Sequence, residues 1–220
     1  MLEAWEFVVR RPELLAQWTL EHVVLVLVAI AIAVVLGICV GIYVSAPRRQ
    51  GLADTVLYLA EIMMTVPSLA LFGLLMLLLG AIGLTTIGFL PAVIALIVYG
   101  QLPILRNTYI AIRAVDPAMI EAGRGMGMNE RQLLLRVKLP LAVPVIMAGL
   151  RNSVVLIIGI GAIAALIGAS GLGVPIFRGL RNARMDLIII GGVAVSILAL
   201  VVDGLMALVE RWVTPKGMRR

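Results

Sequence analysis

Four long apolar runs without a charged side chain constrain this chain more than any other feature. They span residues 23–47, 62–105, 152–177 and 187–202. About 20 apolar residues are enough for one helical crossing of a bilayer. With 62% hydrophobic and 14% charged residues among 220, the chain also has too little polar surface to coat a soluble globule. We therefore expect an all-α membrane protein.

The number of crossings follows from the lengths of these runs. The run over 62–105 is too long for one crossing, and turn-forming residues interrupt it at Gly80, Gly83, Gly88 and Pro91, so it predicts a hairpin of two spans. This gives five transmembrane helices within a membrane domain over residues 22–212. The predicted spans lie at about 22–46, 55–80, 88–112, 140–168 and 186–210.

The basic residues predict how the spans are oriented. Most of the 18 Lys and Arg fall near 48–49, within the loop 113–139 and in the tail 213–220. Because cytoplasmic loops are enriched in Lys and Arg, the N-terminus is expected outside and the C-terminus inside. The net charge of +6 then reflects topology and attraction to anionic lipid headgroups, and no aromatic-interleaved basic patch suggests nucleic acid.

The residues before the first predicted span are expected to lie outside the membrane core. Residues 1–21 mix charges with Trp5, Phe7 and Trp18, which suits a helix lying at the outer membrane interface with tryptophans at headgroup depth. We interpret this segment as periplasmic or interfacial, and residues 213–220 as a basic cytoplasmic tail.

A polar segment between the third and fourth spans carries two helix-start signals. Asp116 followed by Pro117 is an N-cap with proline at the first helical position, which predicts a short helix toward Gly127. Asn129 with Gln132 three residues later resembles a capping box, which predicts a second helix running through the leucines into the bilayer. The segment is therefore expected to be a helix-turn-helix at the cytoplasmic surface.

Glycines in this segment suggest a docking ridge. Gly123, Gly125 and Gly127 weaken an isolated helix and are tolerated best where another surface approaches the backbone closely. An ordinary basic cytoplasmic loop is the alternative interpretation of the same residues.

The order of residues in EAGRGMGMNERQLLLRVKLP, residues 121–140, resembles the EAA loop of ABC-importer permeases. Gly123 stands where the second Ala of that loop is usual, and Val137 stands in the usual Ile position. The resemblance implies that Glu121, Ala122, Gly123 and Gly127 belong to a coupling helix that a separate ATPase drives. It also implies that Leu139 and Pro140 form the joint through which its motion enters span four.

Further stretches narrow the resemblance. VPSLALFGLLMLLLG (66–80), LPLAVPVIMAGLRNS (139–153) and ALIGASGLGVPIFRGL (165–180) are similar to the permeases of osmoprotectant importers, which pass glycine betaine, choline, carnitine or related solutes. Permeases of methionine importers share a five-span plan and a GAGGLG-like stretch, so a methionine or other amino-acid importer stays an alternative. The fold implied is that of a type I ABC-importer permease.

The same resemblance implies partners and a location. It implies a second permease subunit, identical or paralogous, two ATPase subunits that bind ATP and Mg²⁺, and a periplasmic or lipid-anchored substrate-binding protein. It also implies a multi-pass protein of the bacterial inner (plasma) membrane.

Residue types give little support for catalysis in this chain. There is one histidine, one cysteine, no H-E-x-x-H and no G-x-x-x-x-G-K-[ST], so neither a metal site nor a phosphate-binding loop is predicted. We expect no cofactor and no catalytic residue, with ATP hydrolysed by another chain. An intramembrane enzyme using Glu61, Arg151 and Asp203 is a remote alternative, because these residues lie far apart in sequence.

Polar residues within the spans are the remaining candidates. Arg151 is expected to face the bundle interior with Asp203 or Glu61 as its partner, because a charge costs at least about 2.5 kcal/mol in a span. Small polar side chains within the spans can have two roles: they can line a solute path, or they can form hydrogen bonds between helices. The path candidates are Thr65, Ser68, Asn152 and Ser153.

Aromatic residues bear on selectivity. A quaternary ammonium is usually bound by an aromatic cage, yet aromatic residues make up only 5% of the chain, and tyrosines such as Tyr58 and Tyr99 are scattered. Selectivity is therefore expected in the separate binding protein, with a weakly binding passage here. A stand-alone channel or carrier and a membrane scaffold remain alternatives. A carrier would be expected to show inverted repeats or more intramembrane carboxylates, and a scaffold would need no coupling loop.

Overall fold

The computed structural model describes residues 7–214, and every regular element in that range is a helix. Residues 7–10 are also helical, ahead of the first labelled helix. The elements in chain order are α2 (Pro12–Val44), η1 (Pro47–Arg49), α3 (Gln50–Thr65), α4 (Ser68–Ala81), α5 (Phe89–Arg113), α6 (Pro117–Gly125), α7 (Glu130–Leu133), η2 (Leu134–Lys138), α8 (Leu139–Ile163), η3 (Ala164–Ile167), α9 (Gly173–Arg181) and α10 (Met185–Val213).

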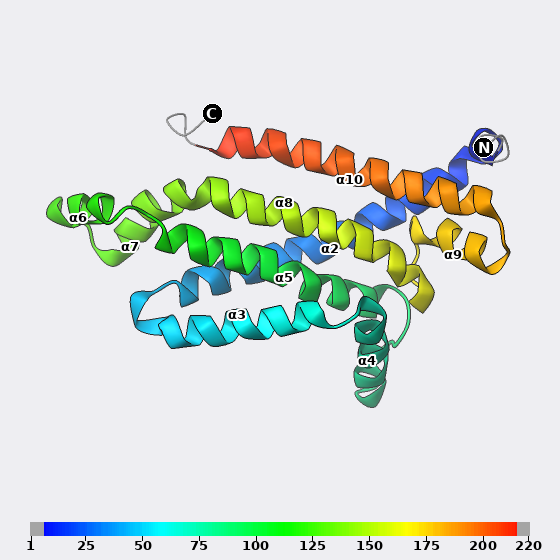
Figure 1. Ribbon diagram of the computed structural model, residues 1–220, viewed down its shortest axis with the longest axis horizontal. Helices are drawn as coiled ribbons and strands as arrows, with labels where there is room; N and C mark the ends of the chain where they lie inside the picture. Colours follow the sequence, from blue (N-terminus) through cyan, green and yellow to red (C-terminus); the bar gives the residue numbers. More distant parts are fainter. Residues whose placement is uncertain (1–6, 215–220) are drawn as a thin grey trace.

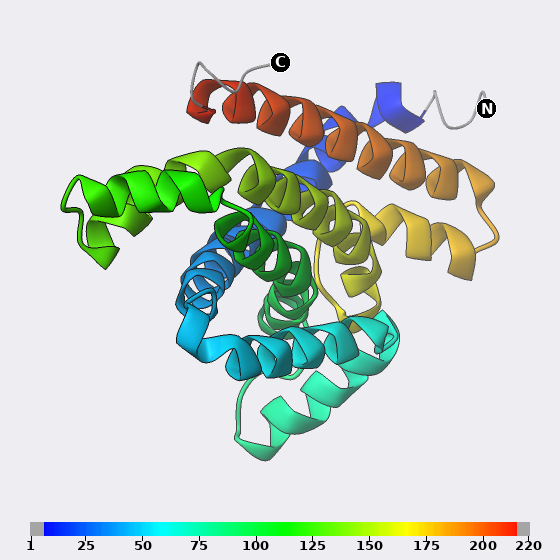
Figure 2. The ribbon, with the colours of Figure 1, turned by 60° about the vertical axis from the view of Figure 1, so that its left-hand side comes forward.

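The long helices run side by side along one axis, as Figure 1 shows. Helix α5 packs against α2, α3 and α8, and α10 lies against α8 and α9. Helices α6 and α7 project from one end of the bundle, at which the α2–α3 turn and the C-terminal end of α10 also lie, while α9 lies at the opposite end (Figures 1 and 2). This arrangement places the predicted cytoplasmic segments together at one end.

The main core forms where α2, α4, α5 and α8 meet. Its largest fully buried side chains include Phe72 of α4, Leu96 of α5 and Ile157 of α8. Small residues bring the helices close: a Cβ atom at Gly149 of α8 would lie 2.5 Å from the carbonyl oxygen of Pro103 in α5. Close packing of this kind replaces the hydrophobic driving force that lipid does not supply between helices.

The second predicted span differs from expectation. Residues 55–80 do not form one helix, because α3 and α4 are bent by 104° at Val66 and Pro67. Four helical stretches are individually long and apolar enough to cross a membrane, and the bent pair makes a fifth span only when its two helices are counted together. The charge-free run begins at residue 62 and continues past Pro67, and hydropathy alone cannot distinguish a straight span from a sharply bent one.

The bend has a local cause and a specific support. Pro67 cannot donate a backbone hydrogen bond, so the helix ends at Thr65 and restarts at Ser68. The buried Tyr99 of α5 donates its hydroxyl to the Val66 carbonyl at 2.5 Å. A carbonyl released by the break is thereby satisfied from the neighbouring helix.

The other predicted boundaries agree more closely. Helices α5 and α10 match the predicted spans 88–112 and 186–210, and α8 with η3 matches 140–168. Helix α2 begins at Pro12, ten residues before the predicted start, so residues 12–21 belong to the same helix as the first predicted span and do not form a separate helix. Trp5 and most of the tail 213–220 lie outside the described residues, and neither the interfacial placement of 1–21 nor the membrane orientation is tested by the helix arrangement.

The glycine-rich loop between α4 and α5 forms the turn that the sequence predicted. The Gly88 N–H donates to the Ile167 carbonyl at 2.7 Å, which joins the α4–α5 turn to the segment after η3. The buried His22 of α2 packs against this segment and its Nε2 lies 3.1 Å from the Ile158 carbonyl. The two turns therefore close the end of the bundle opposite α6.

Candidate coupling site

Helix α6 forms as its capping signals predict. The Asp116 side chain accepts a hydrogen bond from the Ala118 N–H at 2.8 Å, and Pro117 occupies the first helical position. The helix ends at Gly125, after which Gly127 adopts a positive φ of 78° and the Met128 N–H donates to the Gly123 carbonyl at 3.1 Å. This is a glycine-terminated helix end in which orphan carbonyls are satisfied locally.

Helix α7 begins with a complete capping box. The Asn129 side chain accepts from the Gln132 N–H at 2.9 Å, and the Gln132 side chain accepts from the Asn129 N–H at 2.9 Å. The ion pair between Arg124 and Glu130, 2.8 Å long, also spans the turn. Because both partners are mostly exposed, this pair adds little stability, and the reciprocal cap is the main local constraint.

Helix α6 packs on the second helix through one glycine. Gly123 is buried, and a Cβ atom there would lie 2.5 Å from Cδ2 of the buried Leu133. Gly125 and Gly127 have open space where a Cβ would lie. The close approach predicted for the three glycines therefore occurs within this chain at Gly123, whereas Gly127 is required by its positive φ.

The opposite face of α6 is available to another molecule. Glu121 and Ala122 are both exposed, and within residues 7–214 the Glu121 carboxylate has no hydrogen-bond or ion-pair partner. Met119 on the same helix is also half-exposed. Figure 2 shows α6 extending beyond the ends of the neighbouring long helices. The helix thus presents an acidic side chain and bare backbone at the tip of the bundle.

Leu139 and Pro140 are the first two residues of α8. Residues 134–138 form a π-helical turn in which the Leu139 N–H donates to the Leu134 carbonyl, and α8 starts directly after it. Pro140 has no N–H for the usual bond to the carbonyl four residues earlier, which favours a wider turn at this point. Helix α7, the π turn, α8 and η3 form one continuous helical stretch from Glu130 to Ile167.

Arg151 joins α8 to α10. Its guanidinium makes two hydrogen bonds of 2.9 Å to Asp203 and one of 2.9 Å to Glu210. The predicted pairing with Asp203 is confirmed, and Glu210 is a second partner that the sequence did not suggest. The three side chains are between 26% and 38% exposed, so this is a half-buried cluster and not a buried charge.

Glu61 has a different partner. Its carboxylate pairs with Arg106 of α5 at 3.1 Å, and both side chains are about half exposed. The alternative pairing of Glu61 with Arg151 is therefore wrong. An ion pair between residues 45 positions apart in the sequence leaves no local pattern, so Arg106 could not be predicted as the partner of Glu61.

The four path candidates divide into two groups. Ser153 is fully buried and its hydroxyl donates to the Gly100 carbonyl of α5 at 2.9 Å, so it bonds helices and does not line a path. Thr65 and Asn152 are exposed and Ser68 is partly exposed. The Thr65 hydroxyl donates to the Ile62 carbonyl of its own helix at 2.7 Å. The path role of these three stays a prediction.

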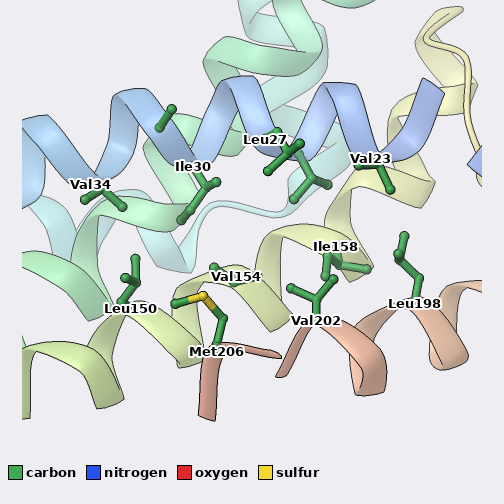
Figure 3. Close-up of a pocket in the computed structure, with 12 residues that line it drawn as sticks. Val23, Leu27, Ile30, Val34, Leu150, Val154, Ile158, Leu198, Val202 and Met206 are labelled. Carbon is green, nitrogen blue, oxygen red and sulfur yellow. The ribbon is translucent and has the colours of Figure 1, made fainter. Parts of the chain in front are cut away.

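One groove in the described residues is lined only by apolar side chains. It has a volume of about 280 Å³ and lies between α2, α8 and α10 (Figure 3). Ile30, Val154 and Val202 contribute to its walls from the three helices. It offers no group that could hold a charged solute, and no set of three or more His, Cys, Asp or Glu side chains within residues 7–214 is arranged to hold a metal ion.

Residues 33–215 match the family described as binding-protein-dependent transport system inner membrane components. The chain is 42% identical over 205 residues to the osmoprotectant import permease protein OsmW of Salmonella typhimurium, covering 93% of this chain and 94% of that protein. It is 41% identical over 202 residues to the choline transport system permease protein OpuBB of Bacillus subtilis, covering 92% and 89% of the two chains.

A solved structure shares the fold. A chain of the inward-facing MetNI methionine ABC transporter superposes with a TM-score of 0.82, covering 94% of this chain and 99% of that one at 24% identity. At that identity the match establishes the helical arrangement alone. The type I importer fold predicted from the sequence is thereby confirmed.

Proposed function

The chain belongs to the family of binding-protein-dependent transport system inner membrane components, and on this premise we propose that it forms, with a second permease subunit, the passage for a quaternary-ammonium osmoprotectant. Glycine betaine, choline and carnitine are the solutes of this class. The observation that carries the proposal is the identity of 41–42% over more than nine-tenths of the chain to permeases named for osmoprotectant and choline transport. Beyond the short GAGGLG-like stretch, the methionine alternative is supported only by a shared fold at 24% identity.

The coupling scheme is part of the same proposal. Two ATPase subunits dock at the end of the bundle that carries α6, which we place in the cytoplasm. The exposed Glu121, Ala122 and the open backbone at Gly125 support a docking surface there. The continuous helix from Glu130 to Ile167 then carries the motion into the membrane domain. In this scheme ATP and Mg²⁺ bind to the partner chains. This chain forms the passage and transmits the motion of the ATPase subunits, without catalysis of its own.

Reconstituted transport tests the proposal directly. The permease is purified with its partner ATPase and binding protein, placed in liposomes containing ATP, and assayed for uptake of radiolabelled glycine betaine, choline and methionine. We expect ATP-dependent uptake of at least one quaternary ammonium and none of methionine. Methionine uptake without quaternary-ammonium uptake would instead support the amino-acid alternative.

A control separates this result from leakage. The same liposomes loaded with a non-hydrolysable ATP analogue should show no accumulation. Uptake that persists with the analogue would indicate a channel or a secondary carrier, and absence of any ATPase in the purified complex would favour a scaffold role.

A further inference from the structure

The ion pair between Glu61 and Arg106 lies part of the way along α3 and α5 and not at the end of the bundle that carries α6. Glu61 is eleven residues beyond the first residue of α3, and Arg106 is seven residues before the last residue of α5. At 1.5 Å per residue these positions are about 16 Å and about 10 Å from the end of the bundle that carries α6. Charged side chains at such depth almost always face a protein interior or a water-filled cavity.

Both side chains of the pair are nevertheless exposed on the surface of this chain. The Glu61 side chain is 45% exposed and that of Arg106 is 54% exposed. The pair therefore faces either water or another protein surface. Acyl chains are excluded, because an exposed ion pair in hydrocarbon would lose its hydration without gaining other polar contacts.

Helix α3 shows three distinct faces at helical spacing. Ala53, Leu57, Ala60 and Met64 form the face packed on the bundle, and Leu52, Leu59 and Met63 form an exposed apolar face. Asp54, Tyr58, Glu61 and Thr65 recur at intervals of four, three and four residues and form the third face. We name these four residues the polar stripe of α3. Each of its members is exposed or half-exposed, whereas the apolar face is the one suited to lipid.

The residues of the polar stripe suit a bulky cation. With Arg106 included, the stripe carries two carboxylates and one guanidinium, so its net charge is negative. Tyr58 is 63% exposed and lies about one helical turn from Glu61 on the same face of α3. A ring face and a carboxylate both attract an ammonium group that has no N–H to donate. The exposed Thr65 continues the stripe toward the bend at Pro67.

We propose that the polar stripe of α3, together with Arg106, lines the water-filled solute path and forms a weak transit site for the ammonium group of the solute. The inference rests on the proposed function and adds to it the position of the path in this chain. Because Glu61 is paired with Arg106, its carboxylate attracts a solute cation less strongly than an unpaired carboxylate would. The site therefore binds the cation only weakly.

Cysteine accessibility tests the position of the path. In the full-length chain with Cys39 replaced by Ser, Tyr58→Cys and Thr65→Cys are made singly, with Leu59→Cys as the matched control. Leu59 is 54% exposed, close to the 63% of Tyr58, and lies at the same depth on the apolar face. Each variant is expressed with its partner subunits, and its membranes are treated with a water-soluble thiosulfonate that carries a trimethylammonium group. We expect residues 58 and 65 to react at least tenfold faster than residue 59.

A charge-reversed reagent tests the preference for cations. At Tyr58→Cys, the trimethylammonium reagent should react at least fivefold faster than a sulfonate reagent of similar size. Adding Asp54→Asn and Glu61→Gln leaves Arg106 as the only charge of the site and should invert this ratio. A ratio that is unchanged by the two substitutions would overturn the cation site.

The outcomes separate this inference from the proposed function. Equal rates at residues 58, 65 and 59 would overturn the path assignment even if osmoprotectant uptake is normal. Ready disulfide formation between two copies at Tyr58→Cys, with no reagent access, would show an interface between subunits and also overturn it. Fast labelling of the stripe in a complex that transports no osmoprotectant would retain the path and refute the proposed solute.

Discussion

Glu121 is the residue through which the coupling proposal is tested most directly. Its carboxylate is exposed on the outer face of α6 and serves no other group within residues 7–214. Glu121→Lys should therefore leave the fold intact and abolish ATP-driven uptake by reversing a charge at the docking surface. Insertion, ATPase co-purification and transport are measured together.

The same substitution elsewhere is the control for Glu121. Glu13 is exposed in the first turn of α2, at the opposite end of the bundle from α6. Glu13→Lys should bind the ATPase and transport normally. Normal co-purification and normal uptake by Glu121→Lys would remove Glu121 from the coupling surface.

Tyr99 has a structural role that its residue type did not reveal. Its hydroxyl satisfies the Val66 carbonyl at the bend between α3 and α4. Tyr99→Phe leaves that carbonyl unpaired and should lower the free energy of unfolding by about 1–3 kcal/mol. The measurement is the unfolding midpoint in detergent, with Tyr109→Phe as a control that is expected to match the parent. An unchanged midpoint for Tyr99→Phe would show that the bend does not depend on this bond.

At the scale of elements, the glycines of α6 separate backbone geometry from docking. Gly127 has a φ of 78°, so Gly127→Ala should cost about 1–2 kcal/mol in local stability. Gly125 lies in the helix with open space around it, so Gly125→Ala should be neutral or stabilising. Amide hydrogen exchange within α6 measures both effects. Faster exchange is expected only for Gly127→Ala, and equal exchange in the two variants would contradict the assignment.

A larger side chain at Gly125 then tests whether a partner approaches the backbone. Gly125→Leu should leave exchange in α6 unchanged and reduce coupled uptake, because the side chain projects into the space reserved for the ATPase. A larger side chain at Gly127, as in Gly127→Val, is a less specific test. The positive φ at Gly127 means that such a variant changes the fold of α6 as well, so only Gly125 isolates the docking effect.

Different elements of this fold were predictable to different degrees. Helices α5, α8 and α10 and the two caps at Asp116 and Asn129 follow from local patterns, namely apolar length and short-range capping chemistry. The bend at Pro67 was not predictable from hydropathy, since no charged residue lies between Ile62 and the end of α4. Non-local contacts, such as Glu61 with Arg106 and Ser153 with Gly100, depend on how the helices pack and have no signature in the sequence around each residue.

At the scale of the whole molecule, α10 is held at its two ends in different ways. Near its start, Gly191 lies against Ile176 of α9, where a Cβ atom would meet the Ile176 side chain at 2.5 Å. Toward its end, Arg151 of α8 binds Asp203 and Glu210. Between these attachments lies the apolar groove of Figure 3. The ion cluster is therefore the main polar attachment of the second half of α10 to the bundle.

Because the two halves of α10 are attached separately, loss of Arg151 should loosen only the second half. Arg151→Met preserves an unbranched side chain but leaves two carboxylates seven residues apart on α10 without their shared cation. Amide hydrogen exchange over residues 203–213 should accelerate about tenfold, which corresponds to about 1.4 kcal/mol, while exchange over residues 187–195 stays at the parent rate. Adding Asp203→Asn and Glu210→Gln should bring the exchange rate most of the way back to that of the parent protein, because these substitutions remove both the unpaired charges and their repulsion. Uniform acceleration along α10 would mean that the helix opens as one unit, and no acceleration would mean that packing on α8 holds it without the ion cluster.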